Sequence, residues 1–168
     1  MTVLGYTHID SPVGPLLAAG DENALHFLSF PARHKSFGPR PEWRQSTALF
    51  ADLRRQLAAY FAGELRCFDI PLRLSGTAFQ NAVWRHLAEI PFGETRTYGE
   101  VAAALGRPTA SRAVGAANGS NPLPILLPCH RVIGADGSLV GFGGGLPVKK
   151  YLLRHEGVLP RGLFAEAN

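Results

Sequence analysis

The sequence predicts an α+β protein made of two small domains, residues 1–75 and 76–168. Short apolar runs separated by turn residues open the chain, which is the pattern of a small sheet. Capped segments with helical periodicity dominate after Gly76. The length of 168 residues suits one compact unit or two small ones. We therefore expect an N-terminal sheet domain with one helix and a mostly helical C-terminal domain.

The first domain begins with three apolar runs, and polar turn sequences separate them. Aspartate, asparagine, glycine and proline fill these turns, so the runs predict a small antiparallel sheet. A helix is predicted over residues 47–62, where Leu49, Leu53, Leu57 and Phe61 recur every fourth residue as a core-facing stripe. No catalytic constellation appears here, and we expect a structural role. The apolar runs are residues 3–9, 15–19 and 24–30.

Two capping boxes start helices in the second domain. Thr77 and Gln80 open one helix, and Thr97 and Glu100 open a shorter one. Gly106 is suited to end this shorter helix, because glycine adopts the left-handed conformation that follows many helices. The capping boxes therefore predict where both helices begin.

A third helix is predicted over residues 109–117, directly after the turn at Arg107-Pro108. Its residues are mostly alanine and glycine, with Arg112 among them. A helix, a tight turn and a small-residue helix together indicate a helix-turn-helix. The last predicted helix covers residues 147–156, with a proline at its first position.

Composition narrows the function classes. No apolar run is long enough to span a bilayer, and no signal-peptide pattern opens the chain, so we expect a soluble cytoplasmic protein. The two cysteines, Cys67 and Cys129, have no metal-ligand spacing, so we expect neither a disulfide scaffold nor a metal site. A net charge of +4 is compatible with nucleic-acid binding without requiring it.

The sequence Pro128-Cys129-His130 sets a thiol beside an imidazole at the end of a stiff, proline-rich segment. A cysteine becomes a nucleophile when a cation, a helix N-terminus or a base favours its thiolate. Successive side chains of an extended strand point to opposite faces, so either the chain turns at Cys129 or the proton passes through a water. Among the carboxylates that follow, Asp136, Glu156 and Glu166, we expect Glu156 to orient the imidazole, because it ends a regular helix.

Two kinds of nucleophile fit these residues, a hydrolase that forms an acyl-enzyme and an acceptor that keeps an alkyl group. A cysteine hydrolase needs an oxyanion hole and usually carries no DNA-binding element. Here a helix-turn-helix precedes the thiol, and its second helix offers Arg112 amid small residues. Such a helix can approach a narrow groove, where one arginine replaces an extruded nucleotide. The order of the motifs favours the alkyl acceptor.

These residues resemble the O6-alkylguanine-DNA alkyltransferase family, of the bacterial type that transfers methyl groups from DNA to a protein cysteine. The resemblance covers residues 79–157, and residues 9–16 and 60–63 extend it more loosely into the first domain. It implies a ribonuclease-H-like first domain and a winged-helix-like helix-turn-helix in the second. The motifs that carry it are residues 111–115, Asn121-Pro122, 128–132, 141–145 and 152–157.

The resemblance implies a role for each catalytic residue. Cys129 accepts the alkyl group from O6 of a flipped guanine, without any cofactor. His130 relays the thiol proton through a water, and Glu156 orients His130. Tyr98 helps to rotate the nucleotide and donates a hydrogen bond to the base. Asn121 holds the turn before the active-site segment.

It also implies a DNA-binding helix and a substrate pocket. The expected partner is duplex DNA that carries O6-alkylguanine, with O4-alkylthymine as a second candidate lesion. The protein is expected to be a monomer, and cooperative binding to DNA is left open. Arg112 fills the space that the base leaves. The other helix residues expected at the DNA are Ser111, Ala113 and Gly115, together with Tyr98. The residues expected in the pocket are Val132, Phe142, Gly143 and Gly144.

The product of this chemistry is a thioether, which water does not cleave, so one turnover per molecule is expected. Phe142 stands where many members of the family have tyrosine, and Gly143 replaces a residue with a side chain. The first change removes a hydroxyl from the pocket rim, and the second predicts a roomier and more mobile pocket that accepts larger alkyl groups. The zinc-binding cluster of some members is missing.

Three other readings use the same residues. A module that recognises alkylated DNA without repairing it needs no cysteine, a cysteine hydrolase ignores DNA, and a regulator needs a specific operator. Tyr98 is alternatively a core aromatic residue and Arg112 a phosphate contact. For Lys149 and Lys150 we expect a solvated helix face or phosphate contacts, and for Cys67 a half-buried thiol.

Overall fold

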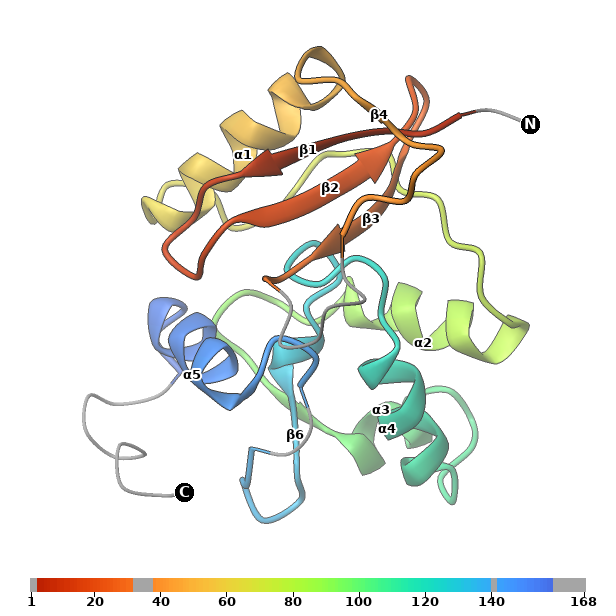
Figure 1. Cartoon of the computed structure of the whole chain (residues 1–168). Coiled ribbons are helices and arrows are strands. Elements are labelled where there is room, and N and C mark those ends of the chain that lie inside the picture. The colour runs from red at the N-terminus through yellow and green to blue at the C-terminus, as the bar shows by residue number, and fades with distance from the viewer. Residues whose placement is uncertain (1–2, 32–37, 140–141, 159–168) are drawn as a thin grey trace. The chain divides into compact units, whose positions relative to one another are not determined.

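The structure, a computed structural model, describes residues 3–31, 38–139 and 142–158 of the chain (Figure 1). The chain forms two compact units, and the boundary between them falls between Leu74 and Ser75. One unit contains a four-stranded sheet and a helix, and the other contains four α-helices in its described part. This is the α+β organisation that the sequence predicts. Among the described residues, no helix has the length and apolar character needed to cross a membrane.

The sheet of the first unit follows the three predicted runs. Strands β1 (Gly5–Ile9), β2 (Leu16–Gly20) and β3 (Leu25–Ser29) pair in antiparallel order, and every residue of β2 is buried. The carboxylate of Asp21 accepts hydrogen bonds from the backbone N–H groups of Asn23 and Ala24 at 2.9 Å, which closes the second turn. A short fourth strand, β4 (Arg44–Gln45), pairs with β1 in parallel, and the sequence analysis missed it.

The helix of the first unit is α1 (Ala51–Phe61), which follows a 3₁₀ turn at Ala48–Phe50. The helix is confirmed, but the predicted stripe is only half right. Leu53 and Leu57 are buried, whereas Leu49 is 41% exposed and Phe61 lies at the rim. Because an α-helix has about 3.6 residues per turn, a spacing of four drifts about 40° at each step. Tyr60 therefore faces the core in place of Phe61.

Both predicted capping boxes are present in the second unit. Helix α2 (Ala78–Leu87) begins after Thr77, which accepts from the backbone N–H of Gln80 at 3.1 Å, while Gln80 accepts from that of Thr77 at 2.9 Å. Helix α3 (Tyr98–Ala104) begins with the same reciprocal pair, here Thr97 and Glu100. Local sequence alone therefore fixes where these two helices start.

The remaining helices shift slightly from their predicted bounds. Helix α4 (Ser111–Gly119) starts and ends two residues later than expected, and α5 (Leu146–His155) starts one residue earlier. Gly106, with φ of +74°, lies in the turn between α3 and α4, as expected for a helix-turn-helix. The winged form of this motif and the ribonuclease-H-like form of the first unit stay predictions.

A pair of two-residue strands links two distant parts of the second unit. Strand β5 (Arg96–Thr97) runs directly into α3, and β6 (Val132–Ile133) follows the segment that contains Cys129. The two strands pair in parallel, with Arg96 opposite Val132 and Thr97 opposite Ile133. The start of the helix-turn-helix is therefore held next to the segment that contains Cys129.

Candidate active site

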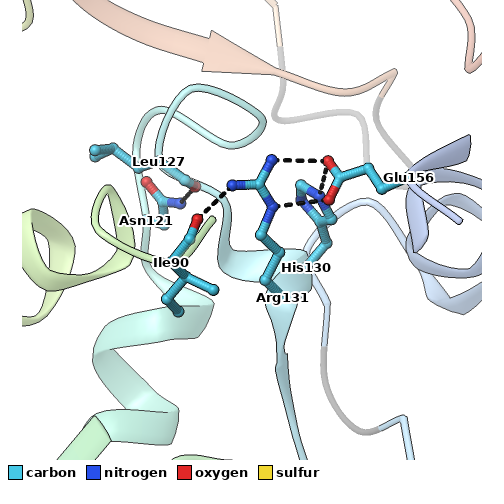
Figure 2. Close-up of polar contacts among 6 residues, drawn as sticks. All are labelled: Ile90, Asn121, Leu127, His130, Arg131 and Glu156. Atoms are coloured by element: carbon cyan, nitrogen blue, oxygen red, sulfur yellow. Dashed lines mark hydrogen bonds and ion pairs between the residues drawn. The ribbon is translucent and has the colours of Figure 1, made fainter. Parts of the chain in front are cut away.

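The segment before the thiol is a tight, buried loop that Asn121 holds. The Asn121 amide donates to the backbone carbonyl of Leu127 at 2.7 Å (Figure 2). Its Oδ1 accepts from the N–H of Leu123 at 2.9 Å. Within this loop Ile125 has φ of +74°, which a β-branched residue rarely adopts. Asn121 thus lies where the resemblance places it, at the turn before the active-site segment.

Cys129 is buried, with 4% of its surface exposed. The chain turns at this residue, in the 3₁₀ helix η2 (Cys129–Arg131). The turn does not bring Nδ1 of His130 into a hydrogen bond with the thiol, so it leaves room for the predicted relay through a water. Burial raises the pKa of the Cys129 thiol to about 11, although the Asn121 side chain and the charge of Lys149 act in the opposite direction. The free protein therefore holds a protonated thiol at neutral pH.

His130 and Glu156 meet in the interior of the second unit, as the sequence predicts. The imidazole Nε2 lies 2.8 Å from Oε2 of Glu156, and neither side chain is exposed (Figure 2). Burial lowers the pKa of His130, against the pull of the carboxylate, so the ring is neutral. A neutral ring beside a carboxylate carries its proton on Nε2, which leaves the lone pair on Nδ1. Nδ1 is buried and has no hydrogen-bond partner among the described residues.

Arg131 completes this network, and the sequence analysis gave it no role. Its Nε donates to Oε1 of Glu156 at 2.7 Å, and its Nη2 donates to Oε2 at 3.0 Å. Its Nη1 donates to the backbone carbonyl of Ile90 at 2.6 Å (Figure 2). Burial favours the neutral acid, yet the bonds from His130 and Arg131 hold the pKa of Glu156 well below its usual range. A buried carboxylate needs a nearby cation. The predicted burial of Glu156 could therefore have pointed to Arg131 in the sequence.

Lys149 contradicts the prediction of a solvated face. Its side chain is fully buried, and its Nζ donates to the backbone carbonyl of Val132 at 2.7 Å. Burial lowers the pKa of Lys149 to about 8, while the charge of Cys129 acts to raise it. Lys149 precedes the buried Leu152, Leu153 and Glu156 by three, four and seven residues, so it shares their helix face. That spacing was readable in the sequence. Lys150 is partly exposed.

The helix-turn-helix brings Tyr98 close to α4. A methyl group added at Gly115 would lie 3.8 Å from two ring carbons of Tyr98, so the ring lies over this position of α4 with room for one small side chain. Burial and the charge of Cys129 raise the pKa of the Tyr98 hydroxyl. Arg112 and Ala113 are exposed, and Ser111 is partly exposed. The helix therefore presents Arg112 to solvent and packs Tyr98 against its small residues.

Of the residues expected in the pocket, Val132 is the one that the structure places beside Cys129. Val132 is fully buried at the start of β6, next to the nucleophile turn. Phe142 and Gly144 are partly exposed and Gly143 is exposed, and the N–H of Gly145 donates to the carbonyl of Phe142 at 2.9 Å. Gly141 lies outside the described residues. That residues 142–144 line a pocket stays a prediction.

Cys67 is exposed, not half-buried, and lies in the irregular segment that follows α1. In the described ranges, no three His, Cys, Asp or Glu side chains gather as they would to hold a metal ion.

Comparison with known proteins identifies the family to which the chain belongs. The model of the 6-O-methylguanine DNA methyltransferase DNA binding domain matches residues 78–158, and that of the ribonuclease-like domain of the same enzymes matches residues 4–74. The chain belongs to this family. The alkyltransferase predicted from the sequence motifs is therefore confirmed.

Individual relatives of this alkyltransferase cover nearly the whole chain. A methylated-DNA–protein-cysteine methyltransferase from Methanosarcina acetivorans is 51% identical over 90% of this chain and 97% of the relative. One from Mycobacterium tuberculosis is 50% identical over 92% and 93%. The crystal structure of Mycobacterium tuberculosis OGT in complex with DNA matches with a TM-score of 0.85 and 49% identity, covering 91% of this chain and 93% of that one.

Proposed function

We propose that the protein repairs duplex DNA by taking an alkyl group from O6 of guanine onto Sγ of Cys129. The sulfur–carbon bond forms as the bond between the alkyl carbon and O6 breaks. The thiol proton leaves to His130, which releases it to solvent, and solvent returns one proton to N1 of the departing guanine. The protons therefore balance, and no cofactor or co-reactant is consumed. The thioether has no activated acyl carbon for water to attack. Each molecule therefore acts once.

The observation that carries this proposal is the buried His130–Glu156 pair directly after Cys129. A thiol with a pKa of about 11 needs a base before it can attack. The lone pair of His130 Nδ1 serves as this base through a bridging water, and Glu156 stabilises the imidazolium that forms. Arg131 holds the carboxylate in place with three hydrogen bonds to Glu156 and Ile90.

The DNA-binding half of the proposal rests on α4. Arg112 is exposed on a helix of small residues, so Ala113 and Gly115 allow the helix to approach the minor groove closely. Arg112 fills the space of the extruded guanine, and Ser111 contacts the backbone. Tyr98 helps to rotate the nucleotide and donates a hydrogen bond to the base. A basic net charge of +4 favours the approach to DNA.

The two halves of the chain divide the work. Residues 76–168 bind DNA and accept the alkyl group, with Val132 and residues 142–144 around the substrate, and residues 1–75 have a structural role. The helix-turn-helix has the winged form, and the first domain is ribonuclease-H-like. The protein acts on DNA in the cytoplasm as a monomer, and Asn121 keeps the nucleophile segment in place.

Cys129→Ser tests the proposal, with Cys67→Ser as the control because Cys67 is an exposed thiol far along the chain from the site. Each protein is mixed with a duplex that carries one O6-methylguanine, and repaired guanine is counted after digestion. We expect one repaired base per wild-type or Cys67→Ser molecule, and none for Cys129→Ser, which still binds the duplex. Binding by the wild type without repair would indicate a recognition module. Turnover of activated esters without any response to DNA would indicate a hydrolase.

A further inference from the structure

The guanidinium of Arg131 has an aromatic neighbour that the proposed reaction does not yet use. Its central carbon lies over the ring of Phe92, 5.8 Å from the ring centroid. Its nitrogens donate to the carboxylate of Glu156 and to the carbonyl of Ile90 (Figure 2). Arg131 therefore has two kinds of partner, the oxygen acceptors and the face of an aromatic ring.

Phe92 belongs to the turn between α2 and β5, and this turn lies against the ion pair of Arg131 and Glu156. Ile90, two residues before Phe92, supplies the carbonyl that accepts from Nη1 of Arg131 at 2.6 Å. Gly93, the next residue, has φ of +84°, and a methyl group added there would lie 3.4 Å from the backbone oxygen of Glu156. The same short turn therefore lies close to both members of the pair.

The ring of Phe92 offers Arg131 more than apolar packing. The face of an aromatic ring carries partial negative charge and attracts a cation, and this attraction is stronger where water is excluded. Arg131 is 6% exposed, whereas Phe92 is partly exposed. A leucine at residue 92 would also exclude water, but it has no negative face. The ring therefore stabilises the guanidinium in one position.

The position of Arg131 matters because it determines where the carboxylate of Glu156 lies. Its Nε and Nη2 hold the two carboxylate oxygens at 2.7 and 3.0 Å. One of these oxygens, Oε2, is also the atom that lies 2.8 Å from Nε2 of His130. A displaced guanidinium would move Oε2 away from the imidazole, and His130 would no longer be held with its proton on Nε2.

Helix α5 anchors the ring of Phe92 as well as the carboxylate. The ring of His155, the last residue of α5, meets that of Phe92 edge to face, with 6.4 Å between the centroids and 78° between the planes. Tyr151, one turn earlier, stacks on His155 with 6.3 Å between the centroids. Glu156 follows His155 directly as the C-cap of this helix. One helix end therefore contacts Phe92 and carries the carboxylate that Arg131 binds.

We propose that Phe92 is a positioning residue for alkyl transfer, whose ring holds Arg131 so that Glu156 keeps the proton of His130 on Nε2. This inference rests on the proposed function. Loss of the aromatic face is expected to slow the transfer step and to leave DNA binding unchanged, because Phe92 does not lie on α4. A contact between a cation and a ring away from water corresponds to roughly tenfold in rate.

Two measurements on the wild type, Phe92→Leu and Phe92→Tyr test the inference. Single-turnover transfer from a duplex with O6-methylguanine, followed over a range of concentrations, separates the transfer rate from the affinity for DNA. Nitrogen–proton NMR of the free protein detects the proton on Nε2 of His130, which exchanges slowly because it is buried and hydrogen-bonded.

We expect Phe92→Leu to transfer roughly tenfold more slowly at unchanged affinity, and its Nε2 proton to exchange rapidly. Phe92→Tyr keeps the ring, so it should match the wild type in both measurements. Phe79→Leu is the matched control for the NMR signal. It removes a similar contact, between the ring of Phe79 and the guanidinium of Arg107 at 5.4 Å, and should leave the signal of His130 unchanged.

A leucine variant with the wild-type rate and signal would overturn the role of Phe92, and so would a tyrosine variant that loses as much as the leucine variant. If the leucine variant does not fold, pentafluorophenylalanine placed at residue 92 keeps the shape of the ring without its negative face. An unchanged transfer rate in that protein would overturn the role as well. Absence of transfer by the wild type, with its NMR signal present, would instead contradict the proposed function.

Discussion

Nε2 of His130 lies 2.8 Å from Oε2 of Glu156, and both side chains are completely buried. This contact sets the tautomer of the imidazole, because the charged carboxylate takes the proton on Nε2. The other ring nitrogen is then a free base on the side of the nucleophile turn. In the proposed reaction, this carboxylate, placed 26 residues after the histidine, leaves Nδ1 as the atom that receives the thiol proton.

Glu156→Gln should be costly for both stability and repair. The change removes the charge that balances Arg131, and leaving a buried guanidinium unpaired costs about 3–5 kcal/mol of the free energy of unfolding. The imidazolium also loses its partner, so transfer should slow by roughly 100-fold or more. Urea unfolding and single-turnover transfer measure the two effects. Glu89→Gln, at an exposed carboxylate, is the control and should change neither.

Stability should fall in mild acid because of His130. Its pKa is lowered by burial in the folded protein, whereas the unfolded chain takes up a proton below about 6.5. The unfolded state therefore binds more protons as the pH falls below 6.5, and the free energy of unfolding decreases. Unfolding curves between pH 8 and pH 5 follow this loss. In His130→Gln the free energy of unfolding should decrease much less over this range. An equally steep decrease in this variant would show that other groups cause the loss of stability.

Lys149→Met should shift the pH profile of transfer toward higher pH. The buried ammonium favours the thiolate of Cys129, so its removal makes the thiol harder to ionise. A shift of about one pH unit corresponds to roughly 1.4 kcal/mol of lost stabilisation of the thiolate. Lys150→Met is the matched control, since the neighbouring lysine is partly exposed. Identical pH profiles of transfer for the two variants would show that Lys149 does not stabilise the thiolate of Cys129.

Arg112→Ala should slow alkyl transfer from duplex DNA but leave transfer from a free alkylated base almost unchanged. The arginine is exposed on α4 and is expected to occupy the space of the flipped nucleotide. We expect roughly tenfold slower transfer from a duplex, from the loss of about 1–3 kcal/mol of contact, and little change with free O6-benzylguanine. Arg154→Ala, at an exposed position on α5, serves as the comparison. Equal losses with both substrates would indicate damage to the active site instead.

The loop at Phe142 and Gly143 should set the size of alkyl group that the protein accepts. Restoring side-chain bulk with Gly143→Ser and a hydroxyl with Phe142→Tyr should slow benzyl transfer more than methyl transfer. The ratio of the two rates is the readout, measured with duplexes carrying each adduct. An unchanged ratio would show that residues 142–143 do not limit the pocket.

Local signals in the sequence were sufficient for much of the fold. The capping boxes at Thr77 and Thr97 specify helix starts through contacts within one turn, so no knowledge of the rest of the chain is needed. The two-residue strands β4, β5 and β6 could not be predicted in this way. Their pairing depends on which distant segment lies alongside, and two residues carry no periodicity.

In the candidate site, too, some residues could be predicted from the sequence and others depend on contacts between distant segments. Cys129, His130 and Glu156 were identified from their chemistry and the family motifs, and the structure brings the last two together. Lys149 was misread because a lysine is usually solvated, although its spacing from Glu156 placed it on the buried face. Arg131 was passed over because its role appears only when Glu156 and the Ile90 carbonyl come together from distant segments.

The most direct test of alkyl transfer is the intact mass of the protein after incubation with a duplex that carries one O6-methylguanine, followed by peptide mapping. The account predicts a gain of one methylene, located on Cys129 and saturating at one per molecule however much DNA is added. A mass that stays unchanged while the lesion is bound, or a methyl group found on any other residue, would contradict it.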